Sequence, residues 1–218
     1  MIGPIRIASA GAERARSELE RCVRAGGVAV FPADTLYGLA CDPFDGAAID
    51  RIHALKGRDE GKPSAVMFFT PLAMRELLAT LGPRTRDALG ALLPGPVTAV
   101  VHNPGRRYAL ACREDPERLG IRLIEGPLAG AACAVFQTSA NPSGEPPPHH
   151  FEDVAPAILA GADVAIDGGE LGGEPSTVVD LTALDSGGAW EVLREGAMPR
   201  AQLERRLAGI GKGPGGAG

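Results

Sequence analysis

Apolar residues recur at helical spacing in some segments of the chain and form short continuous runs in others. Ala15, Leu19 and Val23 fall on one helical face, and Gly26-Gly27 then supplies the stop that a helix C-terminus favours. Further helices are predicted over residues 49–55, 72–81, 85–93 and 154–159, and a helix of small residues over 127–134. Short apolar runs predict strands over residues 28–31, 65–69, 97–102, 120–124, 135–138, 164–167, 177–181 and 190–193.

These elements predict a single α/β domain. Strands alternate with helices in the first half of the chain and follow one another near the end, which favours a twisted sheet of mixed parallel and antiparallel strands flanked by helices. Asp45 is expected to cap the helix over residues 49–55. We assign residues 1–208 to the domain and expect the Gly-rich segment 209–218, which has no core residues, to be disordered.

Composition and charge narrow the classes of function. The chain has 218 residues, 44% of them apolar, which suffices for one sizeable core. Lys and Arg number 22 and Asp and Glu number 27, so the net charge of −5 argues against a nonspecific polyanion binder but permits a local basic cleft. The sequence has no signal-peptide pattern and no apolar run near the roughly 18 residues of a membrane span. We therefore expect a cytoplasmic protein with no membrane contact.

Positive charge gathers between one predicted helix and the strand that follows it. Lys56, Arg58 and Lys62 lie within this short turn. Guanidinium and ammonium groups neutralise phosphate oxygens, so the turn is a candidate for binding a nucleotide. The alternative is an ordinary solvated helix end, because cations there complement the helix dipole.

Three polar loops support the functional interpretation, because each follows a predicted strand. They cover residues 32–38, 139–144 and 168–176. Their candidate binding side chains, with one from the preceding strand, are Thr35, Tyr37, Thr138, Ser139 and Asn141. Strand ends of one sheet converge in space, so these groups and the cationic turn predict a triphosphate site without a P-loop. For the first loop alone, an ordinary turn with Tyr37 in the core is the alternative.

Arg122 lies inside the apolar strand predicted over residues 120–124. A buried guanidinium is costly unless an anion partners it, so Arg122 either lines a ligand cleft or points to solvent; we favour the cleft. Ser176, after a Gly-rich loop, and Arg194, at the end of the last strand, are similar in kind but weaker. Arg194 and Glu195 could equally form a surface pair.

No metal site is predicted. His149 and His150 have no acidic or Cys partners at ligand spacing, and adjacent side chains seldom bind one ion well, so we treat them as loop histidines. The four cysteines contain no CxxC pair and indicate neither a zinc site nor a disulfide framework. The GxxxxGK[ST] and GxSxG motifs are absent from the sequence, and the GxGxxG spacing occurs only within the Gly-rich segment 209–218.

Taken in order, the motifs resemble the YrdC/TsaC family of threonylcarbamoyl-AMP synthases, in its short, single-domain form. The matching stretches are PADTLYGLACDP at 32–43, the KxR at Lys56 and Arg58 with Lys62-Pro63, LPGPVT at 93–98, GIR at 120–122, TSANPSG at 138–144, DGG at 167–169, PSTVVDL at 175–181 and LREGA at 193–197. The chain departs from the residues usual in the family at Ala33, Asp59, Leu93 and Ile124. These positions affect packing and loop shape more than charge. They therefore affect details of the substrate, such as amino-acid specificity, more than the class of reaction.

The resemblance implies an enzyme with the YrdC-like fold and a basic concave cleft. It would condense L-threonine, bicarbonate and ATP, which arrives with Mg²⁺, into threonylcarbamoyl-adenylate and pyrophosphate. Other proteins would transfer the threonylcarbamoyl group to a tRNA adenosine. By the same resemblance, Lys56 and Arg58 would be catalytic; the ATP site would comprise Lys56, Arg58, Lys62, Ser139, Asn141 and Arg194; and the threonine site would comprise Thr35, Tyr37, Arg122, Thr138 and Ser176.

Two alternatives stay open. A module that binds double-stranded RNA or tRNA would use the concave face for a phosphate backbone, and its binding would weaken steeply with salt and need no threonine. The negative net charge favours the enzyme. A paralogue of the same fold could instead carbamoylate a different acceptor, although similar domains usually depend on a fused carbamoyl-phosphate domain.

Overall fold

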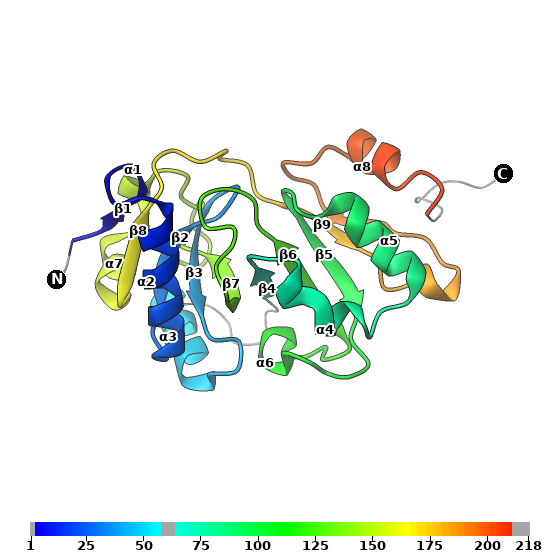
Figure 1. Ribbon diagram of the computed structural model, residues 1–218, viewed down its shortest axis with the longest axis horizontal. Coiled ribbons are helices and arrows are strands. Elements are labelled where there is room, and N and C mark those ends of the chain that lie inside the picture. The colour runs from blue at the N-terminus through cyan, green and yellow to red at the C-terminus, as the bar shows by residue number, and fades with distance from the viewer. Residues whose placement is uncertain (1–2, 58–63, 211–218) are drawn as a thin grey trace.

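One mixed sheet runs through the computed structural model, which describes residues 3–57 and 64–210 (Figure 1). Its strands in that part of the chain are β1 (Ile5–Arg6), β2 (Ala29–Pro32), β3 (Tyr37–Cys41), β4 (Ala65–Phe68), β5 (Val97–His102), β6 (Arg118–Leu123), β7 (Ala134–Ser139), β8 (Val164–Asp167), β9 (Thr177–Asp180) and β10 (Glu191–Arg194). They lie in the order β1-β8-β2-β3-β7-β4-β6-β5-β9-β10. The pairs β1/β8, β2/β8, β4/β6 and β5/β9 are parallel and the other neighbours are antiparallel. The predicted single α/β domain with a mixed sheet is confirmed.

Helices lie against this sheet. The α-helices of the described residues are α1 (Ile7–Ala10), α2 (Ala12–Arg24), α3 (Gly46–Lys56), α4 (Arg75–Leu78), α5 (Pro83–Leu92), α6 (Ala109–Cys112), α7 (Pro156–Gly161) and α8 (Arg200–Arg206). Short 3₁₀ turns are η1 (Leu72–Met74), η2 (Phe151–Asp153) and η3 (Leu184–Ser186). In Figure 1, α2, α3 and α7 lie beside β8, β2 and β3, whereas α5 and α8 lie near β5 and β9. Within the described part of the chain, no helix is long and apolar enough to cross a membrane.

Both faces of the sheet carry an apolar core. In β2, Val30 packs in a cluster that includes Ile49 of α3, whereas Phe31 packs in a second cluster that includes Leu19 of α2. All four side chains are fully buried. A strand buried on both faces has apolar residues at every position, which explains why β2 forms a continuous apolar run in the sequence.

Most of the predicted elements are present, and Asp45 caps α3 as expected by accepting a hydrogen bond from the Ala48 amide (3.0 Å). The helix predicted over residues 127–134 is wrong, because turns occupy 127–130 and β7 begins at Ala134. The Gly130 amide donates to Phe69 O (2.7 Å), so this backbone is held to the end of β4 rather than to a helical turn of its own. The helix predicted over 72–81 is divided between η1 and α4 and ends at Leu78.

The strand β3 is the main element that the sequence pattern missed. The Ala33 amide donates to Leu36 O (3.1 Å), which closes a tight turn, and β3 then pairs antiparallel with β2. The polar loop predicted over residues 32–38 is therefore shorter, since Tyr37 and Gly38 already belong to a strand. The strand β1 and the helices α6 and α8 were also not predicted. Residues 211–218 of the expected Gly-rich tail lie outside the described residues.

Candidate active site

A cavity of about 500 Å³ lies over the central strands of the sheet, between segments that are far apart in the sequence. Thr35 comes from the turn between β2 and β3, Ser139 ends β7 and Ser176 precedes β9. Of the predicted site residues, those lining the cavity are Thr35, Tyr37, Arg122, Thr138, Ser139, Ser176 and Arg194. The predicted convergence of the three polar loops is therefore confirmed.

Arg122 is a buried charge in the cavity wall, which confirms the cleft position favoured from the sequence. Its side chain is 6% exposed and forms an ion pair with Asp34, which is 10% exposed. The guanidinium also lies within hydrogen-bond distance of Thr35 Oγ1 (3.4 Å). Burial raises the pKa of Asp34 and lowers the pKa of Arg122, and the attraction between the two charges offsets part of each shift.

Asp34 is the anion that the burial of Arg122 requires, and the sequence did not identify it as the partner of Arg122. Among the described residues, its Oδ2 atom and Arg122 Nε have no hydrogen-bond partner. Buried polar atoms are usually paired, so these two atoms leave hydrogen-bonding capacity beside the cavity that a bound molecule can use.

Ser176 and Arg194 meet on the cavity wall, although the sequence resemblance assigns them to different substrates. Arg194 donates to Ser176 O (2.7 Å) and lies 3.3 Å from Ser176 Oγ. The Ser176 hydroxyl also shares a hydrogen bond with Thr98 Oγ1 (2.9 Å). This arrangement brings a cation and two hydroxyl groups to one point, where the two predicted substrate sites would adjoin.

The Tyr37 hydroxyl is engaged with backbone rather than open to the cavity. It donates to Gly169 O (2.7 Å) and accepts from the Gly168 amide (2.9 Å), which ties β3 to the loop after β8. Burial raises the pKa of Tyr37 to about 12, so its hydroxyl stays protonated at neutral pH. Tyr37 therefore shapes the cavity wall, and its contact with threonine stays a prediction.

Lys56 supports the segment that carries Ser139. Its side chain is buried at the end of α3, and Nζ donates to Ser139 O, to Asn141 O (2.5 Å) and to Asn141 Oδ1 (3.4 Å). The side-chain amide of Asn141 (Nδ2) in turn donates to Pro142 O (2.9 Å) and Glu145 O (2.6 Å). Both side chains thus fix the loop after β7, and their contact with ATP stays a prediction. Arg58 and Lys62 lie outside the described residues.

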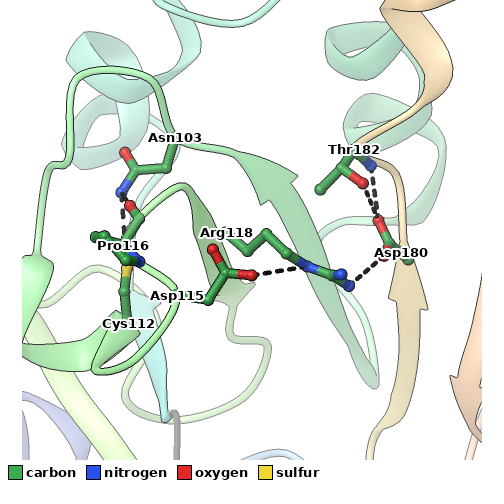
Figure 2. A network of polar contacts seen from close by, with 7 residues as sticks. All are labelled: Asn103, Cys112, Asp115, Pro116, Arg118, Asp180 and Thr182. Atoms are coloured by element: carbon green, nitrogen blue, oxygen red, sulfur yellow. Dashed lines mark hydrogen bonds and ion pairs between the residues drawn. The ribbon is translucent and has the colours of Figure 1, made fainter.

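Arg118 lines the cavity as well and was missed in the sequence. It lies four residues before Arg122 on β6 and therefore on the same face of the strand. Figure 2 shows its guanidinium between Asp115 (3.8 Å) and Asp180, whose carboxylate accepts from the amide (2.8 Å) and hydroxyl (2.6 Å) of Thr182. Because aspartates accompany both arginines of β6, the basic character expected of the cleft stays a prediction.

Comparisons with known proteins agree with this geometry. The model of the Sua5/YciO/YrdC family, described as "Telomere recombination", matches residues 21–196. A threonylcarbamoyl-AMP synthase of Chromohalobacter salexigens is 36% identical over 166 residues, which cover 73% of this chain and 88% of that protein. Another from Thiobacillus denitrificans is 34% identical over 176 residues, which cover 78% of this chain and 92% of that protein.

Solved structures agree at the level of the fold. Sua5 of P. abyssi, complexed with L-threonine, superposes with a TM-score of 0.80 at 26% identity, over 95% of this chain and 61% of that one. E. coli YciO superposes with a TM-score of 0.71 at 26% identity, over 85% of this chain and 90% of that one.

Proposed function

The chain belongs to the Sua5/YciO/YrdC family, and from that premise we propose that it is a threonylcarbamoyl-AMP synthase. It would join L-threonine, bicarbonate and ATP into threonylcarbamoyl-AMP and pyrophosphate, with release of water. The observation that carries the proposal is the meeting of Thr35, Arg122 and Ser176 with Arg194 on one cavity. The P. abyssi Sua5 that this chain resembles was solved with L-threonine.

We assign the carboxylate of threonine to the buried side of the cavity. Arg122 offers a planar set of N–H donors that matches a carboxylate, and the Thr35 hydroxyl lies beside it. Asp34 holds the guanidinium in place before the substrate arrives. This preorganisation lowers the cost of ordering the site when threonine binds.

The reaction needs positioned charge more than it needs a protein nucleophile. The amine of threonine attacks bicarbonate to give a carbamate and water, and a carbamate oxygen then attacks the α-phosphorus of ATP while pyrophosphate leaves. Two anions must approach each other, so fixed cations lower the barrier by stabilising the charge on the phosphoryl oxygens. Arg194, next to Ser176, is the described residue that we assign to this role.

The triphosphate, with the Mg²⁺ that accompanies ATP as substrate, would extend toward Ser139 and the loop after β7. Lys56 serves this region by holding Ser139 and Asn141, and Arg58 and Lys62 would supply further positive charge. Downstream proteins would transfer the threonylcarbamoyl group to tRNA, and a cytoplasmic location would suit that role.

Incubation of the protein with ATP, bicarbonate and one amino acid at a time tests the proposal, with mass detection of the adenylate. We expect an adenylate with L-threonine and none with alanine or leucine. Ser176→Ala and Thr35→Val should reduce product, because both hydroxyls line the cavity. Ser186 is exposed and lies outside the cavity lining, so Ser186→Ala should leave the amount of product unchanged. Failure of threonine to give an adenylate, with ATP bound, would remove the assignment.

A further inference from the structure

Two histidines and a carboxylate come together at the start of η2, outside the residues used above. One ring nitrogen of His149, one of His150 and one carboxylate oxygen of Asp153 all lie within 4.8 Å of one another. Glu170, from the loop after β8, brings a fourth ligand group, since its carboxylate lies 4.0 Å from His150 Nε2. We propose that these four side chains form a zinc site.

The chemistry of the donors selects the ion. Imidazole nitrogens with carboxylate oxygens suit Zn²⁺ and similar first-row ions, whereas Mg²⁺ and Ca²⁺ prefer oxygen ligands alone. Zinc ligands lie about 2.0–2.2 Å from the ion, which places tetrahedral donors roughly 3.4 Å apart. Asp153 and Glu170 are exposed and His149 and His150 half-buried, so small side-chain rotations can close the remaining distance.

Backbone contacts fix the histidine pair in place. The Tyr37 amide donates to Pro148 O (2.9 Å), and the Leu171 amide donates to His149 O (2.9 Å). A β-carbon at Gly173 would lie 3.6 Å from the His149 ring, so that ring packs closely against the loop after β8. The backbone that carries the two histidines is therefore in place before an ion binds, which favours affinity.

A zinc ion here would join two segments of the cavity wall. Pro147 precedes the histidines and Pro175 follows Glu170 in its loop, and both prolines line the cavity. A bond from the ion to His150 and Glu170 would cross-link these segments. The site thus offers zinc-dependent restraint of the cavity wall, although its existence does not depend on the proposed activity.

The proposal departs from the expectation drawn from the sequence. Adjacent histidines seldom share an ion, and no ligand spacing was evident in the sequence. The 3₁₀ turn over Phe151–Asp153 brings Asp153 back beside the histidines, and the pairing of His149 with Leu171 brings Glu170 to them from a distant segment. Neither approach is visible in the spacing along the chain.

Titration calorimetry of the tag-free full chain, stripped of metal with a chelator, tests the site. We expect one Zn²⁺ per chain, with no heat from Mg²⁺ at the same concentration. Asp153→Asn and His150→Ala should abolish the uptake. Glu152→Gln, an exposed carboxylate next to Asp153, and His102→Ala, an exposed histidine elsewhere, should bind as the wild type does.

The melting temperature is a second measurement, which distinguishes loss of the site from loss of the fold. Zn²⁺ should raise the melting temperature of the wild type and of Glu152→Gln but not of Asp153→Asn, whose side chain keeps its shape and lies in solvent. If the wild type takes up no stoichiometric Zn²⁺, the site does not exist. Equal uptake by Asp153→Asn, His150→Ala and the wild type would place the ion elsewhere and overturn the assignment.

Discussion

Two arginines of β6 line the same cavity but differ in burial and in ion-pair partner. Arg122 is 6% exposed and pairs with Asp34 from the turn between β2 and β3, whereas Arg118 is 42% exposed and pairs with Asp180 at the end of β9. Both side chains leave the same face of β6, with Gly120 between them. Strand position alone therefore does not decide the environment of a cation.

The difference lies in what each pair contributes. A buried ion pair adds little net stability over apolar residues, but the loss of one partner leaves an uncompensated charge, so the Arg122 geometry is fixed. In the second pair Arg118 is open to solvent although Asp180 is 14% exposed, so water screens the pair and it contributes less. We infer that the buried end orients the small carboxylate of threonine and that the open end attracts the larger anion.

The largest effect on stability is expected from the removal of Arg122. Arg122→Met should destabilise the protein by about 3–5 kcal/mol, because Asp34 stays buried without a partner. The pair Asp34→Leu with Arg122→Met should recover much of that loss, as measured by urea unfolding. If the double variant is as unstable as the sum of the single variants, the charges are not coupled.

A smaller effect is expected from Tyr37, which anchors the wall near the buried end. Tyr37→Phe should cost about 0.5–1.5 kcal/mol, because the Gly168 amide and the Gly169 carbonyl, which are only partly shielded from solvent, lose their partner. Burial raises the folded pKa of Tyr37 to about 12, above the ordinary 10.0, so the wild type loses stability as pH rises from about 10 to 12. Unfolding followed across that pH range should show a shallower loss in Tyr37→Phe, and parallel curves would contradict it.

At the open end, Arg118→Ala should change stability by less than about 1 kcal/mol. Under the proposed function, its KM for ATP should rise while kcat changes less, and the effect should shrink in high salt. Arg107→Ala removes another surface pair, with Glu76 (2.6 Å), and Arg107 is not among the cavity-lining residues of the described chain. Steady-state kinetics that show equal KM shifts for both variants would remove Arg118 from the site.

The smallest expected effect concerns Thr182, which holds the partner of Arg118. Thr182→Val removes the hydroxyl donor to Asp180 (2.6 Å) but keeps the amide donor (2.8 Å), so stability should fall by only about 0.5 kcal/mol. The KM for ATP should shift in the same direction as in Arg118→Ala and by less. A larger shift than that of Arg118→Ala would mean that Asp180 acts on the substrate without the arginine.

The sequence predicted those elements in which the local pattern of apolar residues reflects burial in the fold. The continuous apolar run at residues 28–31 reflects burial on both faces of β2, and Asp45 marked the start of α3 correctly. The pattern failed over residues 127–134, where small residues suit a helix but contacts with β4 decide the backbone. Contacts between segments that are distant in the sequence produce no hydrophobic periodicity.

The candidate site shows the same division. Polar groups after strands predicted that Thr35, Ser139 and Ser176 would converge, and all three line the cavity, while their roles in binding stay predictions. The partner of Arg122 was not visible, since Asp34 lies in a turn far from β6 in the sequence, and the inward face of Arg118 was overlooked. A check for period two along β6 would have connected Arg118 with Arg122.

Calorimetric titration of ATP into the protein, with and without L-threonine and bicarbonate, tests the central claim that one cavity binds both substrates. The account predicts that ATP binds more tightly when both are present, and that threonine binds more tightly by the same factor when a non-hydrolysable ATP analogue is present. Identical ATP affinities in the two titrations, with threonine binding detected separately, would contradict it.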